Sequence, residues 1–102
     1  MKSSRLIAFE TLHKIFCDST YSNLAVDNAL KDVDKDKAFI SALVYGVVER
    51  KITLDYYINK YLTAKPKPKI MTVLRLGAYQ LLFMDKVPSS AAINESVKLT
   101  RD

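Results

Sequence analysis

The chain has 102 residues, 49% of them hydrophobic and 26% charged, as in an ordinary globular domain with one hydrophobic core. Two glycines and three prolines are too few for a loop-rich β-sandwich, and no stretch is apolar over the length of a membrane span, so we expect no membrane partner. The formal charge of +5 and the pI near 9.4 favour a polyanionic partner, RNA or DNA, over an acidic small molecule.

The first two predicted elements are helices, because the spacing of apolar residues is close to 3.6 almost throughout the chain. Residues 4–17 form the first helix, with a wide apolar face that carries Ala8, Leu12 and Ile15. A second, short helix follows, for which Ser22 is a suitable N-cap.

The third predicted helix follows an acidic stretch in which Asp34 or Asp36 can cap it. We expect it to end at Arg50 and Lys51, whose positive charges suit the C-terminal end of a helix dipole. A fourth helix is indicated by the apolar spacing over residues 54–62.

The fourth helix must end before Pro66 and Pro68, which cannot lie inside a helix and favour extended geometry in the residues before them. Residues 68–84 then form a fifth helix that is apolar on nearly all sides, so we expect it to be the buried, central one. A sixth helix begins after Pro88. The sequence therefore predicts a single domain over residues 1–102, an all-α bundle of about six helices.

Several residues have expected structural roles inside this bundle. Gly46 and Gly77 lie within predicted helices, where glycine is unfavourable, and this indicates the close approach of a neighbouring helix. Arg75 lies on the most apolar helix and needs a carboxylate partner if it is buried. Glu95, on the adjacent predicted helix, is the candidate, and Pro88 forms the turn between the two.

The residues offer little catalytic chemistry. His13 is the only histidine, without a second ligand at metal-binding spacing, so we expect it on a solvated helix face and expect no metal site. Cys17 lies at the end of the first helix and is expected to have no partner histidine nearby in the sequence, so a core or half-buried thiol is the favoured interpretation over a nucleophile. A single cysteine excludes an internal disulfide and fits the reducing cytoplasm. We expect no catalytic residue in this chain.

Binding is better supported than catalysis. Cationic side chains occur near the expected helix ends and between the prolines of the loop before the fifth helix, where they could contact phosphates. These RNA-binding candidates are Lys2, Arg5, Arg50, Lys51, Lys65, Lys67 and Lys69. For any one lysine, a solvated surface position remains the favoured alternative.

Four tyrosines could add base stacking if they are exposed, namely Tyr21, Tyr56, Tyr57 and Tyr61. Their helical spacing favours partial burial in the core instead.

Three segments, "AFISALVYGVVER", "LRLGAYQLLFM" and "VPSSAAINESV", together resemble the NusB-like domain found at the N-terminus of Sun/RsmB-type rRNA cytosine-C5 methyltransferases. The resemblance runs through nearly the whole chain, and its last block is the most specific. It implies an all-α fold and RNA, in particular rRNA, as the partner.

In these enzymes the domain precedes a catalytic domain that binds S-adenosylmethionine, so the resemblance implies that this chain is part of a longer protein, continuing beyond "SVKLTRD". The expected function is to bind or orient small-subunit rRNA for that domain, with no cofactor in these residues. Two alternatives stay open: a free-standing NusB-type transcription antitermination factor, and a non-catalytic protein-interaction domain.

Overall fold

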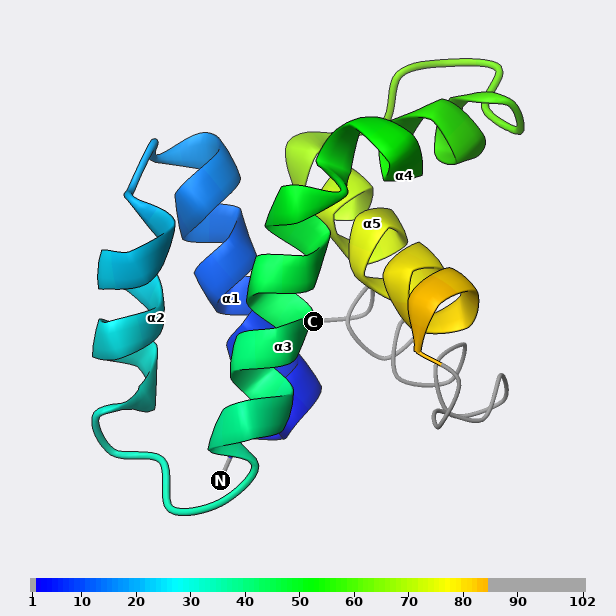
Figure 1. The fold of residues 1–102 in the computed structure, drawn as a ribbon. Coiled ribbons are helices and arrows are strands. Elements are labelled where there is room, and N and C mark those ends of the chain that lie inside the picture. Colours follow the sequence, from blue (N-terminus) through cyan, green and yellow to red (C-terminus); the bar gives the residue numbers. More distant parts are fainter. Residues whose placement is uncertain (1, 85–102) are drawn as a thin grey trace.

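The computed structural model describes residues 2–84, and these form five α-helices and no strand (Figure 1). The helices are α1 (Ser4–Cys17), α2 (Ser22–Leu30), α3 (Lys37–Glu49), α4 (Lys51–Asn59) and α5 (Pro68–Phe83). The predicted all-α class is therefore confirmed for this part of the chain. The sixth helix, with Pro88 and Glu95, falls outside the described residues.

α3 has the most central position in the described structure. It packs against each of the other four helices, whereas α5 packs against α1, α3 and α4 (Figure 1). The expectation that residues 68–84 form the central helix is not confirmed, since Leu81 and Leu82 of α5 are each about half exposed. α3 has this position because Ile40, Leu43 and Val47 recur at helical spacing and are fully buried.

The hydrophobic core lies between α1, α3, α4 and α5, with one side chain contributed by α2. α1, α3 and α5 each present an apolar stripe to it and α4 contributes Leu54, and burial of each large aliphatic side chain stabilises the fold by about 1.5–3 kcal/mol. The residues of this cluster are Ala8, Phe9, Leu12, Val26, Ile40, Leu43, Val44, Val47, Leu54, Val73 and Leu76.

The starts of α2 and α3 differ from the prediction in detail. Ser22 is the first residue of α2 and Tyr21 is its N-cap, so Ser22 does not cap the helix. Asp36 is the N-cap of α3, but its backbone has a left-handed φ of 63° and its side chain caps no N–H group. Its carboxylate instead accepts a hydrogen bond from Ser4 Oγ at 2.8 Å, which links the starts of α1 and α3.

A single residue, Arg50, separates α3 from α4. Its N–H donates to the Gly46 carbonyl at 3.0 Å, and its own carbonyl accepts from the N–H of Leu54 at 2.9 Å. Arg50 is therefore both the C-cap of α3 and the N-cap of α4. Lys51 does not end the third helix as predicted but begins the fourth. The chain turns a sharp corner here without a loop (Figure 1).

The close approach expected at Gly46 is made by α5. The ring of Tyr79 lies so near that a Cβ at position 46 would overlap its outer atoms, including Cε1 at 2.6 Å. Glycine at this position leaves space for the Tyr79 ring, which would have to shift for any larger residue; its helical backbone in α3 places no demand of its own. Gly77 is buried within α5, and its packing role stays a prediction.

Candidate nucleic-acid interface

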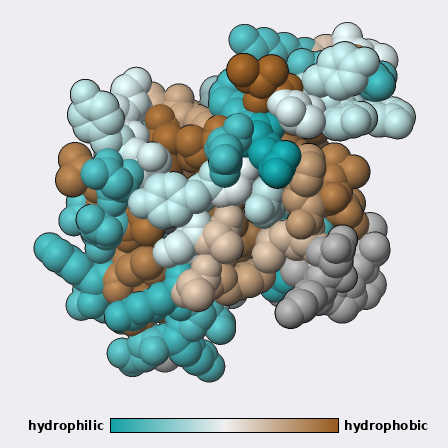
Figure 2. Space-filling model, viewed as in Figure 1, coloured by the Kyte–Doolittle hydropathy of each residue, from teal (hydrophilic) through white to brown (hydrophobic). Residues whose placement is uncertain are grey.

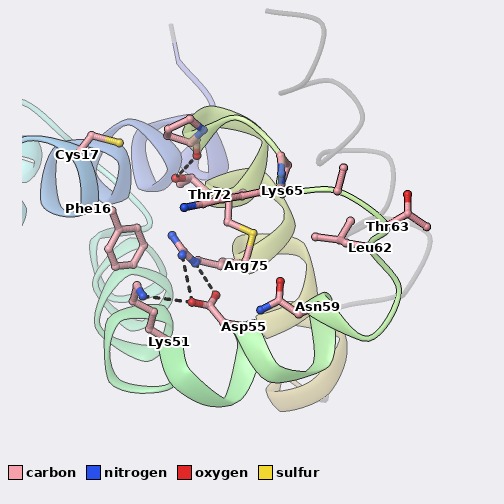
Figure 3. Close-up of a pocket in the computed structure, with 14 residues that line it drawn as sticks. Phe16, Cys17, Lys51, Asp55, Asn59, Leu62, Thr63, Lys65, Thr72 and Arg75 are labelled. Atoms are coloured by element: carbon pink, nitrogen blue, oxygen red, sulfur yellow. Dashed lines mark hydrogen bonds and ion pairs between the residues drawn. The ribbon is translucent and has the colours of Figure 1, made fainter.

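A pocket of about 950 Å³ opens between the C-terminal end of α1, one side of α4, the start of α5 and the loop that joins α4 to α5 (Figure 3). Three cationic side chains line it, Lys51, Lys65 and Arg75, together with one carboxylate, Asp55. The pocket is thus a positively charged concavity next to the proline-rich loop.

Arg75 is held against Asp55 on one wall of this pocket. Its Nε donates to Asp55 Oδ1 at 2.7 Å and its Nη2 donates to Oδ2 at 3.1 Å, and the guanidinium lies 4.7 Å from the centre of the Phe16 ring (Figure 3). The Arg75 side chain is 12% exposed. The expected carboxylate partner is therefore present, but it is Asp55 of α4. Glu95, which we had predicted, lies outside the described residues.

Lys51 donates a second charged hydrogen bond to the same carboxylate, from Nζ to Asp55 Oδ2 at 3.1 Å. Partial burial by itself would raise the pKa of Asp55, but hydrogen bonds from Arg75 and Lys51, with the positive charges of both groups, lower this pKa below its ordinary value. Asp55 is therefore ionised at neutral pH and shared between two cations. Its negative charge is compensated within the protein.

The loop after α4 places Lys65 at the pocket and Lys67 close to it along the chain. Pro66 separates Lys65 from Lys67, both of which are exposed, and Lys67 has the extended backbone expected before Pro68 (φ −63°, ψ 152°). Lys69 is half-buried in the first turn of α5. Since the two prolines stiffen this segment, Lys65 and Lys67 are presented to solvent with little backbone freedom.

The two N-terminal candidates lie elsewhere. Lys2 forms a surface ion pair with Glu10 at 2.9 Å. Arg5 is half-buried, donates from Nε to the buried Gln80 Oε1 at 2.6 Å and lies 5.3 Å from the Phe39 ring centre. Arg5 therefore joins α1 to α5 within the fold, which is a structural contact that the sequence did not predict.

Arg50 is exposed, with its guanidinium 4.3 Å from the centre of the Phe83 ring. The structure therefore does not gather all seven candidate cations into one patch. It brings Lys51 and Lys65 together in the pocket, with Lys67 next to Lys65 along the loop.

The tyrosines are more exposed than predicted. Tyr21, Tyr56, Tyr57 and Tyr61 are 76%, 61%, 43% and 86% exposed, so the expectation of partial burial in the core is wrong for them. Three of these residues lie on or directly after α4. Lys60 Nζ lies 4.4 Å from the ring centre of Tyr56 and 5.3 Å from that of Tyr57.

The charge of this region was a signal available in the sequence. Residues 51–69 contain five lysines and one aspartate, a formal charge of +4 against +5 for the whole chain. In Figure 2, the surface over α4 and the loop after it, at the upper right, is mostly teal and pale, with one brown patch. The excess positive charge of the protein is thus concentrated in α4, the loop and the start of α5.

Other chemistry in the described part of the chain is limited. Cys17 is exposed, not core or half-buried as expected, and its Sγ lies 3.5 Å from Nδ1 of His13, one helical turn earlier. The expectation that Cys17 has no partner histidine nearby is therefore wrong. Within residues 2–84, no three His, Cys, Asp or Glu side chains are grouped as a metal site would need, and no helix is long and apolar enough to cross a bilayer.

Comparison with known proteins identifies relatives of two kinds. A family model described as the NusB family matches residues 2–102. The chain is 36% identical over 104 residues to the probable ribosomal RNA small subunit methyltransferase B of Bacillus subtilis (strain 168), and 38% identical over 107 residues to the protein of that name from Synechocystis sp.. These matches cover 97% and 99% of the chain but only 23% and 24% of the relatives, namely their N-terminal part.

The chain thus spans about a quarter of the length of these two relatives. It is also 32% identical over 104 residues to the transcription antitermination protein NusB of Bacillus velezensis, where the match covers 98% of the chain and 79% of the relative.

Proposed function

This chain belongs to the NusB family, and from that premise we propose that it is an RNA-binding domain that helps to bind or orient small-subunit rRNA for cytosine-C5 methylation. The methylation would be carried out by a catalytic domain of the same protein, with S-adenosylmethionine as the methyl donor. The proposal is supported by the two methyltransferase B relatives, whose names specify ribosomal RNA of the small subunit. In this proposal the protein works in the cytoplasm.

The observation that carries the RNA-binding role is the position of Lys65 in the lining of a basic pocket, with the exposed Lys67 two residues further along the same loop. Phosphate groups are attracted to such lysines, and each contact releases counterions from the RNA. Because Asp55 is already compensated by Arg75 and Lys51, the pocket presents little repulsion to a phosphate. The proline-stiffened loop also lowers the conformational entropy lost when the RNA binds.

The test is to replace Lys65, Lys67 and Lys69 together by alanine and to measure the affinity for a single-stranded rRNA fragment. A matched control carries alanine at Lys31, Lys35 and Lys37, three exposed lysines around the α2–α3 connection, at the opposite end of the molecule in Figure 1. Both variants lose three positive charges. We expect the first to weaken binding at least tenfold at about 0.15 M salt and the control to change it much less. Equal losses would mean that the loop is not the contact surface.

A second candidate function is that of a free-standing transcription antitermination factor, favoured by the 79% coverage of the NusB protein of Bacillus velezensis. The size of the native protein in a cell lysate, detected with an antibody against this chain, separates the two. A band several times the 11.6 kDa of this chain supports the methyltransferase proposal. A band only slightly larger supports the antitermination factor. An affinity for RNA that is undetectable, or that does not depend on salt, supports instead a protein-interaction domain.

A further inference from the structure

One side of α4 carries two exposed tyrosines, Tyr56 and Tyr57, that do not pack into the hydrophobic core. Leu54 is fully buried and Ile58 is half-buried, and these two residues attach α4 to the rest of the fold. Successive residues of a helix are separated by about 100° around its axis, so Tyr56 and Lys60 point to a different side from Leu54 and Ile58. Tyr57 lies beside them and is also exposed. Burial among residues 2–84 therefore does not explain the two tyrosines.

These side chains form a defined cluster. The rings of Tyr56 and Tyr57 meet edge to face, with their centres 5.5 Å apart and their planes at 75°. Lys60 Nζ lies 4.4 Å from the first ring centre and 5.3 Å from the second, within the range of a cation–π contact. The result is an aromatic surface with a positive charge held against it, and we call these three residues the tyrosine face.

The charge around the tyrosine face favours a negatively charged partner over a neutral or basic one. Asp55 is the only carboxylate in residues 51–69, and it is already bound by Arg75 and Lys51. Asp55 and Asn59 of α4 line the basic pocket, and Tyr56 and Lys60 directly follow them, so these two side chains lie about 100° around the helix from the pocket side. An RNA strand that binds the lysines of the pocket and loop and continues around α4 would meet Lys60 and the rings beside it.

We infer that the tyrosine face stacks on unpaired bases, so that the RNA bound by this domain is single-stranded; the inference rests on the RNA-binding function proposed above. Aromatic rings can stack on bases only when the base faces are accessible, and in a duplex those faces are covered by neighbouring bases. Stacking also tolerates different sequences, because every base has a π-face. In this arrangement the lysines contact the phosphates of the RNA and the tyrosines stack on its bases.

The test uses three RNA ligands with equal numbers of phosphates: an unstructured single strand, a strand of the same length with abasic ribose at every position, and a duplex. The variant is Tyr56→Leu with Tyr57→Leu, which removes both rings but keeps apolar side chains on the helix. The control is Tyr21→Leu, which removes an exposed ring at the N-cap of α2. Urea denaturation of each variant verifies folding, and Tyr56→Phe with Tyr57→Phe restores the rings without the hydroxyl groups.

We expect the wild-type chain to prefer the single strand over both the abasic strand and the duplex. The double leucine variant should bind the single strand about tenfold or more weakly, while its affinity for the abasic strand is unchanged. The phenylalanine variant should bind as the wild type does, and Tyr21→Leu should have little effect.

Two results would overturn the inference and they are distinguishable. If the wild-type chain binds all three ligands but the double leucine variant binds the single strand as tightly as the wild type does, the RNA-binding function stands. The tyrosine face would then not contact bases and would be a candidate surface for a protein partner. If the wild-type chain binds none of the three, the proposed RNA-binding function fails, and base stacking fails with it.

Discussion

Arg75 of α5 and Asp55 of α4 form a bidentate ion pair, although 20 positions separate them in the sequence. Both side chains are largely shielded, with exposures of 12% and 20%. Replacing Arg75 by alanine leaves Asp55 with Lys51 alone, and we expect this to lower the free energy of unfolding by about 1–3 kcal/mol. Urea denaturation measures the change. In a double-mutant cycle with Asp55→Asn, the two losses should not add, and additive losses would contradict a direct interaction.

The same pair predicts a dependence of stability on pH. The pKa of Asp55 is lowered in the folded state, so the unfolded chain binds a proton at this site more readily than the folded chain does. The contribution of Asp55 is therefore fully present above its ordinary pKa of about 3.9 and is lost as the pH falls through the lower, folded value. Denaturation of the wild type and of Asp55→Asn between pH 6 and pH 2.5 should show the difference between them shrink in acid. A constant difference would count against this assignment.

Gly46 should not tolerate a larger side chain while Tyr79 is present. A Cβ at position 46 overlaps the outer ring atoms of Tyr79, which is itself stacked on Phe83. Alanine is about 1 kcal/mol better than glycine in a helix, so Gly46→Ala without a clash would stabilise α3. We expect instead a net destabilisation of about 1–2 kcal/mol, measured by urea denaturation. With Tyr79→Ala as the background, the same change should become neutral or favourable, and an equal loss in both backgrounds would argue against the clash.

The two cations at the start of α1 should behave differently. Arg5 donates to the buried Gln80 at 2.6 Å, so Arg5→Ala should cost about 1–3 kcal/mol of unfolding free energy. Lys2 forms only an exposed pair with Glu10, and Lys2→Ala should change stability by less than about 0.5 kcal/mol. Thermal or urea denaturation compares them directly. Equal effects would show that the contact between Arg5 and Gln80 contributes little.

RNA binding should depend on salt in proportion to the number of lysines at the interface. If about four phosphates are contacted on a single strand, a log–log plot of affinity against salt should have a slope near −3, and a fourfold rise in salt should weaken binding roughly 50-fold. Replacing Lys65, Lys67 and Lys69 by alanine should reduce the slope to about −1. Fluorescence anisotropy at several salt concentrations provides both slopes, and an unchanged slope in the variant would exclude these lysines as phosphate contacts.

The helices could be predicted from the sequence because their signals are local. The bounds of the first helix match the prediction, and Pro66 and Pro68 marked the loop before α5 through their covalent geometry alone. The corner at Arg50 was misplaced because no glycine or proline interrupts the apolar pattern there. The end of α3 depends on how α4 packs, which is not a local property.

The candidate site was less predictable, since it depends on which helix faces meet. Tyr56 and Tyr57 occur at positions that suit either a buried or an exposed face, and only the packing of Leu54 decides between them. The partner of Arg75 likewise required the distance between two helices. Charge was the exception, because the five lysines and one aspartate of residues 51–69 can be counted in the sequence without knowledge of how the helices pack.

The one-residue connection at Arg50 does not tolerate an insertion or a deletion, in contrast to the loop between α4 and α5. Each residue inserted there would rotate α4 by about 100° and shift it by about 1.5 Å, which would withdraw Leu54 from the core. The loop between α4 and α5 is under no such restriction, since insertions in an exposed loop cost little. Lengthening or shortening it would change where Lys65 and Lys67 lie relative to the pocket and leave the five helices as they are. In an engineered version, RNA affinity and fold stability could therefore be adjusted independently.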